Sequence, residues 1–373
     1  MSVTERLKIV FQQVQDPRID RTKKHPLMSI IFVAICAAIA GIDEWVGMHD
    51  YCEANFDLFA KLVPLPNGVP SHDTFGRVMS RLDPKRFNEC FMEFSKSLQR
   101  KCREVIAIDG KTARGSSDPD GAKGALHSVS AWATQNKLVL GQVVTDDKSN
   151  EITAVPLLLA MLDLENQIVT MDAMGCQRKT SAQIIKQKGD YVLGLKGNQG
   201  TLHEDIKLLF ADWQASGWKD FHGTYHEEND KGHGRIECRR CWASSDLGSL
   251  VDTHKWPGFV SAVLVESGRT IKGKTTTEQR FYISSLEPNA EQLSQAIRAH
   301  WEVENKVHWV LDLTYNEDGS KIYKDNGPEI MNMARKLGLN LVNHARGKLS
   351  VRRMQNKAKM SAEYLFKLIS QEN

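Results

Sequence analysis

The sequence predicts an α/β protein: a mixed β-sheet flanked by helices, with an N-terminal helical domain and a β-rich insertion. Three observations carry this prediction. Residues 1–103 show few strand patterns, short apolar strands alternate with helices from Val105 onward, and residues 204–285 carry alternating strand-like runs. Hydrophobic residues make up 41% and charged residues 25% of the 373 residues, which excludes a disordered or coiled-coil chain.

The N-terminal domain, residues 1–103, is expected to be a helical, DNA-binding domain. Its apolar run 30–42 is shorter than the ~20 residues needed to cross a bilayer, so it predicts a buried helix in a cytoplasmic protein with no membrane contact. Residues 64–70 break the helical pattern, and Ser71 and Asp83 are typical N-caps of the two helices that follow. Cations on these helices suggest a helix-turn-helix-like unit, although an ordinary bundle with solvated arginines also explains them: Arg77, Arg81, Lys85 and Arg86.

Residues 104–203 contain the first part of the predicted sheet. The expected strands are 105–109, 127–134, 138–145, 168–172 and 191–196, and the expected helices are 152–162 and 177–188. The second and third strands are close enough along the chain to form a hairpin. The later strands are separated by helices, which is typical of parallel strands joined by crossovers. The order therefore predicts a mixed sheet.

The insertion, residues 204–285, is expected to add strands at 235–243, 259–266 and 278–285, the last of which returns to the sheet. Cys238 and Cys241 form a single CxxC, but positions three apart on a strand face opposite sides, which favours structural thiols over zinc. Residues 286–345 are expected to complete the core with helices 289–311 and 328–342. Residues 346–373 form a basic C-terminal tail, in which Glu363 is the one acid between positions 346 and 367.

Two predicted strands end in the same way, with an apolar run, an aspartate and a small residue. These aspartates are Asp109 and Asp172. The carboxyl ends of parallel strands meet at one edge of a sheet, where ligands bind. Two carboxylates that meet there repel each other unless a cation lies between them, and their oxygens suit Mg²⁺ or Mn²⁺. The alternative is that each aspartate caps the following turn; finding both strand ends favours the metal site.

A third carboxylate lies on the predicted helix 289–311. Leu293, Ile297 and Trp301 predict a buried stripe on this helix, and Glu304 continues that stripe toward Val307. A buried glutamate must be neutral, paired or bound to a metal. A salt bridge to a buried arginine or lysine is the alternative to a metal shared with the two aspartates.

These acidic residues and their surroundings resemble the D-D-E triad of bacterial insertion-sequence transposases, most closely the H-repeat-associated, ISAs-type group. The likeness covers nearly the whole chain. It implies a ribonuclease-H-like catalytic core whose β-rich insertion separates the second aspartate from the glutamate. The motifs that carry it are IAIDGK with Asp109, DAMGCQ with Asp172, HWEVEN with Glu304, LKGNQG (195–200), GHGRIE (232–237), YISS (282–285) and NED (316–318).

The resemblance implies a chemistry. Asp109, Asp172 and Glu304 would hold two Mg²⁺ (or Mn²⁺) ions ~3.5–4 Å apart for in-line displacement at DNA phosphodiesters. Water would cleave the insertion-sequence ends, and the freed 3′-hydroxyl would join target DNA. The implied partners are transposon ends, target DNA and a second copy of the chain on DNA, in the bacterial cytoplasm at the nucleoid. A structure-guided nuclease with the same site, or a catalytically silent or domesticated DNA-binding protein, are the alternatives.

Further DNA contacts are expected around this triad. In the wider superfamily a tyrosine and an arginine precede the glutamate, and the matching positions here are Ile297 and His300, so His300 or Lys306 would contact phosphate. A flexible loop at 110–124 and the basic tail would touch the DNA backbone, with a steep salt dependence. Strand-end turns, a solvated hairpin and a solvated helix are the structural alternatives. The remaining candidates are Lys111, Arg114, Lys196, Asn198, Gln199, His233, Arg235, Arg352 and Arg353.

Overall fold

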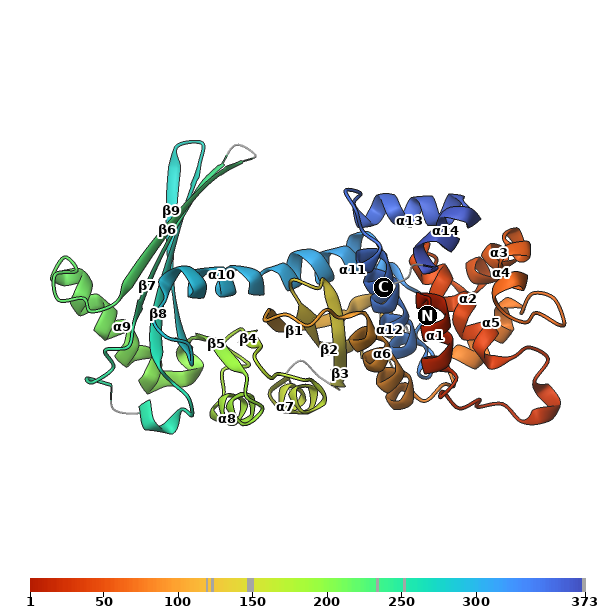
Figure 1. Cartoon of the computed structure of the whole chain (residues 1–373), viewed down its shortest axis with the longest axis horizontal. Helices are drawn as coiled ribbons and strands as arrows, with labels where there is room; N and C mark the ends of the chain where they lie inside the picture. Colours follow the sequence, from red (N-terminus) through yellow and green to blue (C-terminus); the bar gives the residue numbers. More distant parts are fainter. Residues whose placement is uncertain (119, 122–123, 146–150, 233–234, 251–252, 371–373) are drawn as a thin grey trace. The chain divides into compact units, whose positions relative to one another are not determined.

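The computed structural model describes residues 1–118, 120–121, 124–145, 151–232, 235–250 and 253–370. The chain divides into two compact units. The first comprises Met1–Lys101, Gly110–Lys148 and Glu304–Asn373, and the second comprises Cys102–Asp109 and Ser149–Val303. The described strands follow the order β3-β2-β1-β4-β5-β9-β8-β7-β6, and helices flank this mixed sheet (Figure 1). The predicted α/β class is therefore confirmed.

The first unit is mainly helical. The predicted buried helix is α2, whose residues from Ser29 to Ile39 are all buried because it is apolar on every side. The hydroxyl of Ser71 accepts a hydrogen bond from the Thr74 N–H, so Ser71 is the N-cap that the sequence predicts. The described helices of this unit are α1 (Val3–Phe11), α2 (Leu27–Ile39), α3 (Trp45–Ala54), α4 (Phe56–Leu62), α5 (His72–Met79), α6 (Pro84–Leu98), α11 (Trp309–Leu313), α12 (Gly327–His344), α13 (Val351–Met360) and α14 (Ala362–Ile369).

Helix α12 is the centre of the first unit. It is buried along nearly its whole length and packs against α2 (Figure 1). A Cβ on Gly338 would lie 3.2 Å from the Ile39 nitrogen, so glycine allows the two helices to approach closely. The Asn340 side chain accepts from the Val139 N–H at 2.7 Å and donates to the Val139 carbonyl at 2.8 Å. It thereby pairs with β3 (Leu138–Thr145), which forms the predicted antiparallel hairpin with β2 (Leu126–Ala133).

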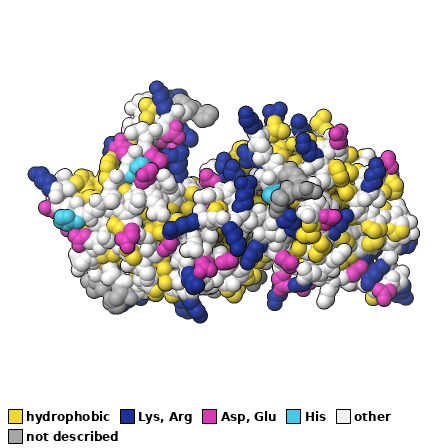
Figure 2. Space-filling view, viewed as in Figure 1, with side chains coloured by type: hydrophobic (Ala, Val, Ile, Leu, Met, Phe, Trp, Pro, Cys, Tyr) yellow, Lys and Arg dark blue, Asp and Glu magenta, His cyan; other side chains and the backbone are white. Residues whose placement is uncertain are grey.

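The basic C-terminal residues form two packed helices rather than a tail. Val351, Met354 and Leu365 of α13 and α14 are buried, and the Tyr51 hydroxyl donates to the Ala358 carbonyl at 2.7 Å. The buried apolar side of each helix is what turns this segment into folded structure. The cations lie on the outer side, where Arg352 is exposed, and Figure 2 shows Lys and Arg side chains gathered over α13.

The second unit carries most of the sheet. Strands β1 and β4, and β4 and β5, pair in parallel, while β9 returns antiparallel to β5 as expected from the sequence. Helices α7 and α8 lie side by side in the crossovers between them (Figure 1). The elements of this unit are β1 (Val105–Ala113, of which 105–109 belong here), α7 (Glu151–Met161), β4 (Ile168–Met171), α8 (Arg178–Lys186), β5 (Asp190–Leu195), α9 (Gly200–Ala215), β6 (Thr224–Gly232), β7 (Arg235–Ser244), β8 (Ser261–Ile271), β9 (Lys274–Ser284) and α10 (Ala290–His300).

Strand β6 was not expected from the sequence. Its residues, TYHEENDKG, are polar and mostly exposed, so they lack the apolar alternation by which strands are recognised. It forms because its backbone pairs with β7 along the full length, from Thr224 opposite Ala243 to Gly232 opposite Arg235. Cross-strand hydrogen bonds, rather than burial, therefore define this strand.

The predicted continuous helix 289–311 is wrong. Helix α10 ends at His300, and Glu304–His308 is a π-helical turn that belongs to the first unit and precedes α11. Trp301, expected in the buried stripe, is 38% exposed and lies under the Arg280 guanidinium at 4.5 Å. Glu304 is exposed instead of lying on the packed face. The helix is interrupted at Trp301, before the π-turn begins, so faces assigned with an unbroken 3.6-residue period do not extend to Glu304.

Candidate active site

Asp109 and Asp172 lie side by side in the second unit. The last register pair between the parallel strands β1 and β4 is Ile108 opposite Met171. Asp109 follows the first of these residues and Asp172 follows the second. Neighbouring strands are about 4.8 Å apart, so the two carboxylate-bearing residues are adjacent at the carboxyl edge of the sheet. Asp109 is half-buried and Asp172 is exposed.

The turn after β4 holds one oxygen of Asp172. Its Oδ1 accepts from the Met174 N–H at 2.9 Å and from the Gly175 N–H at 3.4 Å, which is the turn-capping role expected as the alternative. A Cβ on Gly175 would lie 2.6 Å from the Met171 sulfur, so the turn requires glycine there. Among the described residues no hydrogen-bond partner is found for Asp172 Oδ2. One oxygen thus orients the carboxylate while the other is available to a ligand.

A second motif, LKGNQG, fixes this turn from the neighbouring strand. The Asn198 side chain donates to the Ala173 carbonyl at 2.6 Å, and the Gln199 side chain donates to the Cys176 carbonyl at 2.7 Å. Both amides therefore position the segment that follows Asp172, a role that the sequence analysis did not assign to them. Lys196, at the end of β5, is exposed and has no ion-pair partner in the part of the chain that the structure describes.

His300, the last residue of α10, lies against β4. Its Nδ1 is 3.1 Å from the hydroxyl of Thr170, two residues before Asp172. Burial lowers the pKa of His300 to about 4, and the negative charge of Asp172 opposes this shift. The imidazole is therefore neutral near pH 7 and lies close enough to Asp172 to sense its charge. A neutral ring can contact a phosphate by hydrogen bonding, and the expected phosphate contact of His300 stays a prediction.

Two family models match the chain. Residues 9–95 match the family described as DDE_Tnp_1-associated, and residues 100–341 match the family described as Transposase DDE domain. The chain belongs to the DDE transposase family. Enzymes of this family cut and rejoin DNA and generally use divalent metal ions. No helix among the described residues is both long and apolar enough to span a membrane.

Relatives of this transposase extend over nearly its whole length. The chain is 39% identical to the "H repeat-associated putative transposase YhhI" of Escherichia coli strain K12 over 357 residues, which cover 93% of each protein. It is 38% identical to the "Putative transposase YncI" of Escherichia coli O157:H7, over 96% of this chain and 92% of that protein. A solved structure, the piggyBac transposase synaptic complex with hairpin DNA, aligns with a TM-score of 0.42 at 13% identity, over 98% of this chain and 78% of the other.

The first part of the expected loop 110–124, up to Ser116, is regular structure. Strand β1 continues to Ala113, and Arg114 to Ser116 form a 3₁₀ turn in the first unit of the transposase. The Lys111 ammonium lies 2.5 Å from Asp312 and 3.4 Å from Glu317, with 9% of its side chain exposed. The expected loop is therefore wrong at Lys111, which two carboxylates hold in a strand, and its contact with DNA stays a prediction.

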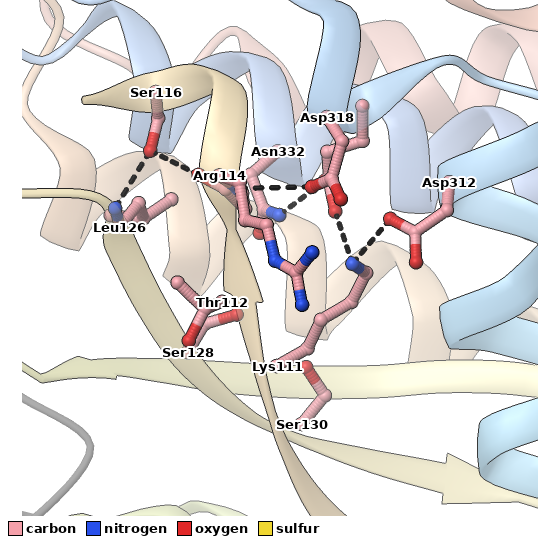
Figure 3. A network of polar contacts seen from close by, with 12 residues as sticks. Lys111, Thr112, Arg114, Ser116, Leu126, Ser128, Ser130, Asp312, Asp318 and Asn332 are labelled. Carbon is pink, nitrogen blue, oxygen red and sulfur yellow. Dashed lines mark hydrogen bonds and ion pairs between the residues drawn. The ribbon is translucent and has the colours of Figure 1, made fainter.

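The carboxylates around Lys111 come from the NED motif and the segment before it. Glu317 is buried, and its Oε1 also accepts from the Asn332 side chain at 2.7 Å. Asp318 accepts from the Arg114 backbone N–H at 3.0 Å, which leaves the guanidinium of Arg114 exposed (Figure 3). The network joins the strand that carries Asp109 to the segment before α12.

Lys336 is a buried cation that the sequence analysis missed. It is 1% exposed, and its ammonium donates to Ser128 at 3.2 Å, to Ser130 at 2.8 Å and to the Gln142 side chain at 2.5 Å. Burial lowers the pKa of Lys336 to about 8, while the negative charge of Glu317 opposes this shift. The sequence signal that could have identified Lys336 is its position within the apolar pattern of helix α12, where a charged group needs partners.

The other sequence candidates are divided between the two units. Arg235 is at the tip of the β6–β7 hairpin and pairs with Glu237 at 2.9 Å, and His233 lies outside the described residues. Lys306 and Glu304 are exposed on the π-turn of the first unit. Within the described residues, no group of three or more His, Cys, Asp or Glu side chains is arranged to hold a metal ion.

Proposed function

We propose that this chain cleaves DNA at the ends of an insertion sequence and joins the freed 3′ ends to target DNA, with Asp109, Asp172 and Glu304 as the catalytic carboxylates. The observation that carries the proposal is the adjacency of Asp109 and Asp172 at the carboxyl edge of two parallel strands. We include Glu304 because it lies in the HWEVEN motif and because its carboxylate is exposed.

The donor set suits divalent cations. Carboxylate oxygens are hard ligands, and Oδ2 of Asp172 has no protein partner among the described residues. Two bound Mg²⁺ or Mn²⁺ ions would activate the attacking hydroxyl and stabilise the leaving 3′ oxygen. The chain holds Asp172 in place through the Met174 N–H and holds the turn through Asn198 and Gln199, so this carboxylate is ordered before any ligand arrives.

Two further side chains of the second unit would act on the DNA. Lys196, exposed beyond β5, would pair with a phosphate near the cleaved bond. His300, neutral and supported by Thr170, would hydrogen-bond to the same region without adding charge. Cleavage and joining both displace an oxygen at a phosphodiester, so one set of residues serves both steps. We expect two copies of the chain to bridge the two ends.

Asp172→Asn tests the proposal. The amide keeps an oxygen to accept the Met174 N–H, so the turn should survive while one metal ligand is lost. We expect Mg²⁺-dependent nicking of the DNA that flanks the gene to fall by about 10³-fold, equivalent to about 4 kcal/mol, with unchanged binding of that DNA in EDTA. Asp212→Asn, an exposed change on α9, is the matched control and should cut at the wild-type rate.

Each outcome of this experiment separates the alternatives. Nicking by Asp172→Asn at the wild-type rate would contradict the assignment of the site. Wild-type protein that hydrolyses ends but never joins a 3′-hydroxyl to target DNA would be a nuclease on the same fold. Wild-type protein that binds ends tightly and does not nick them with Mg²⁺ would be a catalytically silent DNA-binding protein.

A further inference from the structure

A second concave site lies entirely within the first unit, between α5 and the segment 321–325. It is a cavity of about 630 Å³, within the range of pockets that hold small ligands. Nothing in the candidate active site uses it. Its lining residues are Trp45, His72, Asp73, Gly76, Arg77, Ser80, Arg81, Lys321, Ile322, Tyr323, Lys324 and Asp325.

The cavity walls are cationic. Arg77 of α5 and Arg81, just after this helix, are exposed, as are Lys321 and Lys324 opposite them. No ion pair involves any of the four cavity cations in the portion of the chain that is described. Two acidic residues, Asp73 and Asp325, also line the cavity, so the cations outnumber the acids by four to two.

Two half-buried aromatic rings, Trp45 and Tyr323, complete the lining. A Cβ on Gly76 would lie 3.1 Å from the Trp45 ring, so glycine lets the indole lie directly against α5. Aromatic rings beside cations are the combination by which proteins hold unpaired nucleotides, with bases stacked on the rings and phosphates paired with the charges. The backbone of a duplex would meet the cations but would leave the rings without a partner.

The wall opposite α5 is built into the fold. The Asn326 N–H donates to the Ser80 carbonyl at 3.0 Å, and its side chain donates to the Leu82 carbonyl at 3.0 Å. Ile322 is buried, and a Cβ on Gly327 would lie 2.8 Å from the Ser80 hydroxyl. The segment 321–325 is therefore anchored to the end of α5, and the cavity exists before a ligand binds.

We infer that this cavity binds an unpaired nucleotide of the DNA substrate, with its base on Trp45 and Tyr323 and its flanking phosphates on the four cations. The inference rests on the proposed function for the identity of the DNA. Arg77 of α5 and the nearby Arg81 suggested DNA binding from the sequence. The inference gives them a single-stranded DNA end as partner, rather than the major groove of a duplex.

Fluorescence of 2-aminopurine tests the inference in EDTA, where no cutting occurs. The probe base is placed in a three-nucleotide 3′ overhang of a 20-base-pair duplex, and a blunt duplex with the probe at its terminal pair is the comparison. We expect the wild-type protein to quench the overhang probe and bind this DNA at least fivefold more tightly than the blunt duplex. Tyr323→Ala and Trp45→Ala should each lose most of the quenching, and Trp45→Phe should restore it.

The charge variants supply the second readout. The double variant Arg77→Ala/Lys324→Ala should weaken overhang binding by about tenfold and lower the salt slope by about 1.5, since each single-strand phosphate contact contributes about 0.7. Lys61→Ala, an exposed change outside the cavity, should alter neither value more than twofold. Unchanged quenching in both Trp45→Ala and Tyr323→Ala would overturn the inference. So would equal loss of blunt and overhang binding in the charge variant, which would indicate a duplex backbone surface.

The two proposals fail separately. Loss of the cavity signals without loss of Mg²⁺-dependent nicking on a blunt substrate would leave Asp109 and Asp172 as assigned. Nicking that survives Asp172→Asn would remove the proposed function while the overhang measurements in EDTA still report on the cavity. Circular dichroism melts of each variant identify any that fail to fold, and Tyr323→Ala stands in for Trp45→Ala in that case.

Discussion

Strand β1 runs through two regions in which charged side chains have opposite surroundings. In the second unit Asp109 and Asp172 are adjacent, and one oxygen of Asp172 has no protein partner among the described residues. In the first unit Lys111 is enclosed by Asp312 and Glu317. The first arrangement leaves negative charge available to a cation from outside. The second neutralises its charge within the fold.

The difference separates residues that we propose to act on a ligand from residues that hold the structure. Like charges side by side cost free energy unless a cation joins them, so the aspartate pair is stable only with a ligand or with exposure to solvent. Buried opposite charges that are hydrogen-bonded need no ligand, and removing one partner leaves the other uncompensated. Both kinds of charge lie within family motifs, and only their surroundings distinguish them.

The largest expected effect comes from removing one charge of the Lys111 network. Glu317→Gln keeps the hydrogen bond from Asn332 but removes the charge that faces Lys111, and we expect the free energy of unfolding to fall by about 3 kcal/mol. Urea unfolding measures this loss. Lys111→Met combined with Glu317→Gln should recover more than half of it, because the two charges that face each other are then removed together.

An exposed pair is the control for this prediction. Glu165 and Lys188 are 3.2 Å apart with 57% and 76% of their side chains exposed. Glu165→Gln should change the free energy of unfolding by less than about 0.5 kcal/mol. Equal effects at Glu165 and Glu317 would refute the view that burial makes the Lys111 network structural.

The second effect is a pH dependence at Lys336. Its pKa is about 8 in the folded chain and 10.5 unfolded, so the unfolded chain binds more protons between these values and stability rises with pH there. The free energy of unfolding of the wild type minus that of Lys336→Met should rise by up to about 3 kcal/mol from pH 8 to 10.5. Lys61→Met, an exposed change, should give a constant difference across the same range. A flat difference for Lys336→Met would contradict the burial of its charge.

The smallest effect is expected at His300, beside the aspartates. Its pKa falls to about 4 on folding from 6.5, so the unfolded chain binds the extra proton between these values, and stability is lost as pH falls from 6.5 to 4. Because the ring is only half-buried by surface area, we expect about 1–2 kcal/mol after allowance for solvent screening. His300→Gln should remove this part of the acid dependence, measured by thermal unfolding in EDTA. An unchanged acid dependence would mean that the ring is charged in the folded chain.

Local patterns predicted much of the fold. The N-cap at Ser71, the buried helix α2 and the β2–β3 hairpin follow from residue types and spacing, and the structure confirms each of them. The misses have a common cause. Strand β6 is polar and is defined by backbone pairing with β7, and the π-turn at Glu304–His308 changes the helical repeat, so neither shows the apolar periodicity by which elements are predicted.

The sequence by itself determined where the charged residues lie and which of them we propose as catalytic, because aspartates that follow apolar runs, and the motifs around them, are local features. It also determined the alternation of helices and strands, which follows from apolar periodicity. Only the tertiary structure decided which charges are enclosed and which are open. Asp109, Lys111 and Glu317 are alike as charged motif residues in the sequence, and their different roles arise from desolvation and from partners that folding brings from elsewhere in the chain.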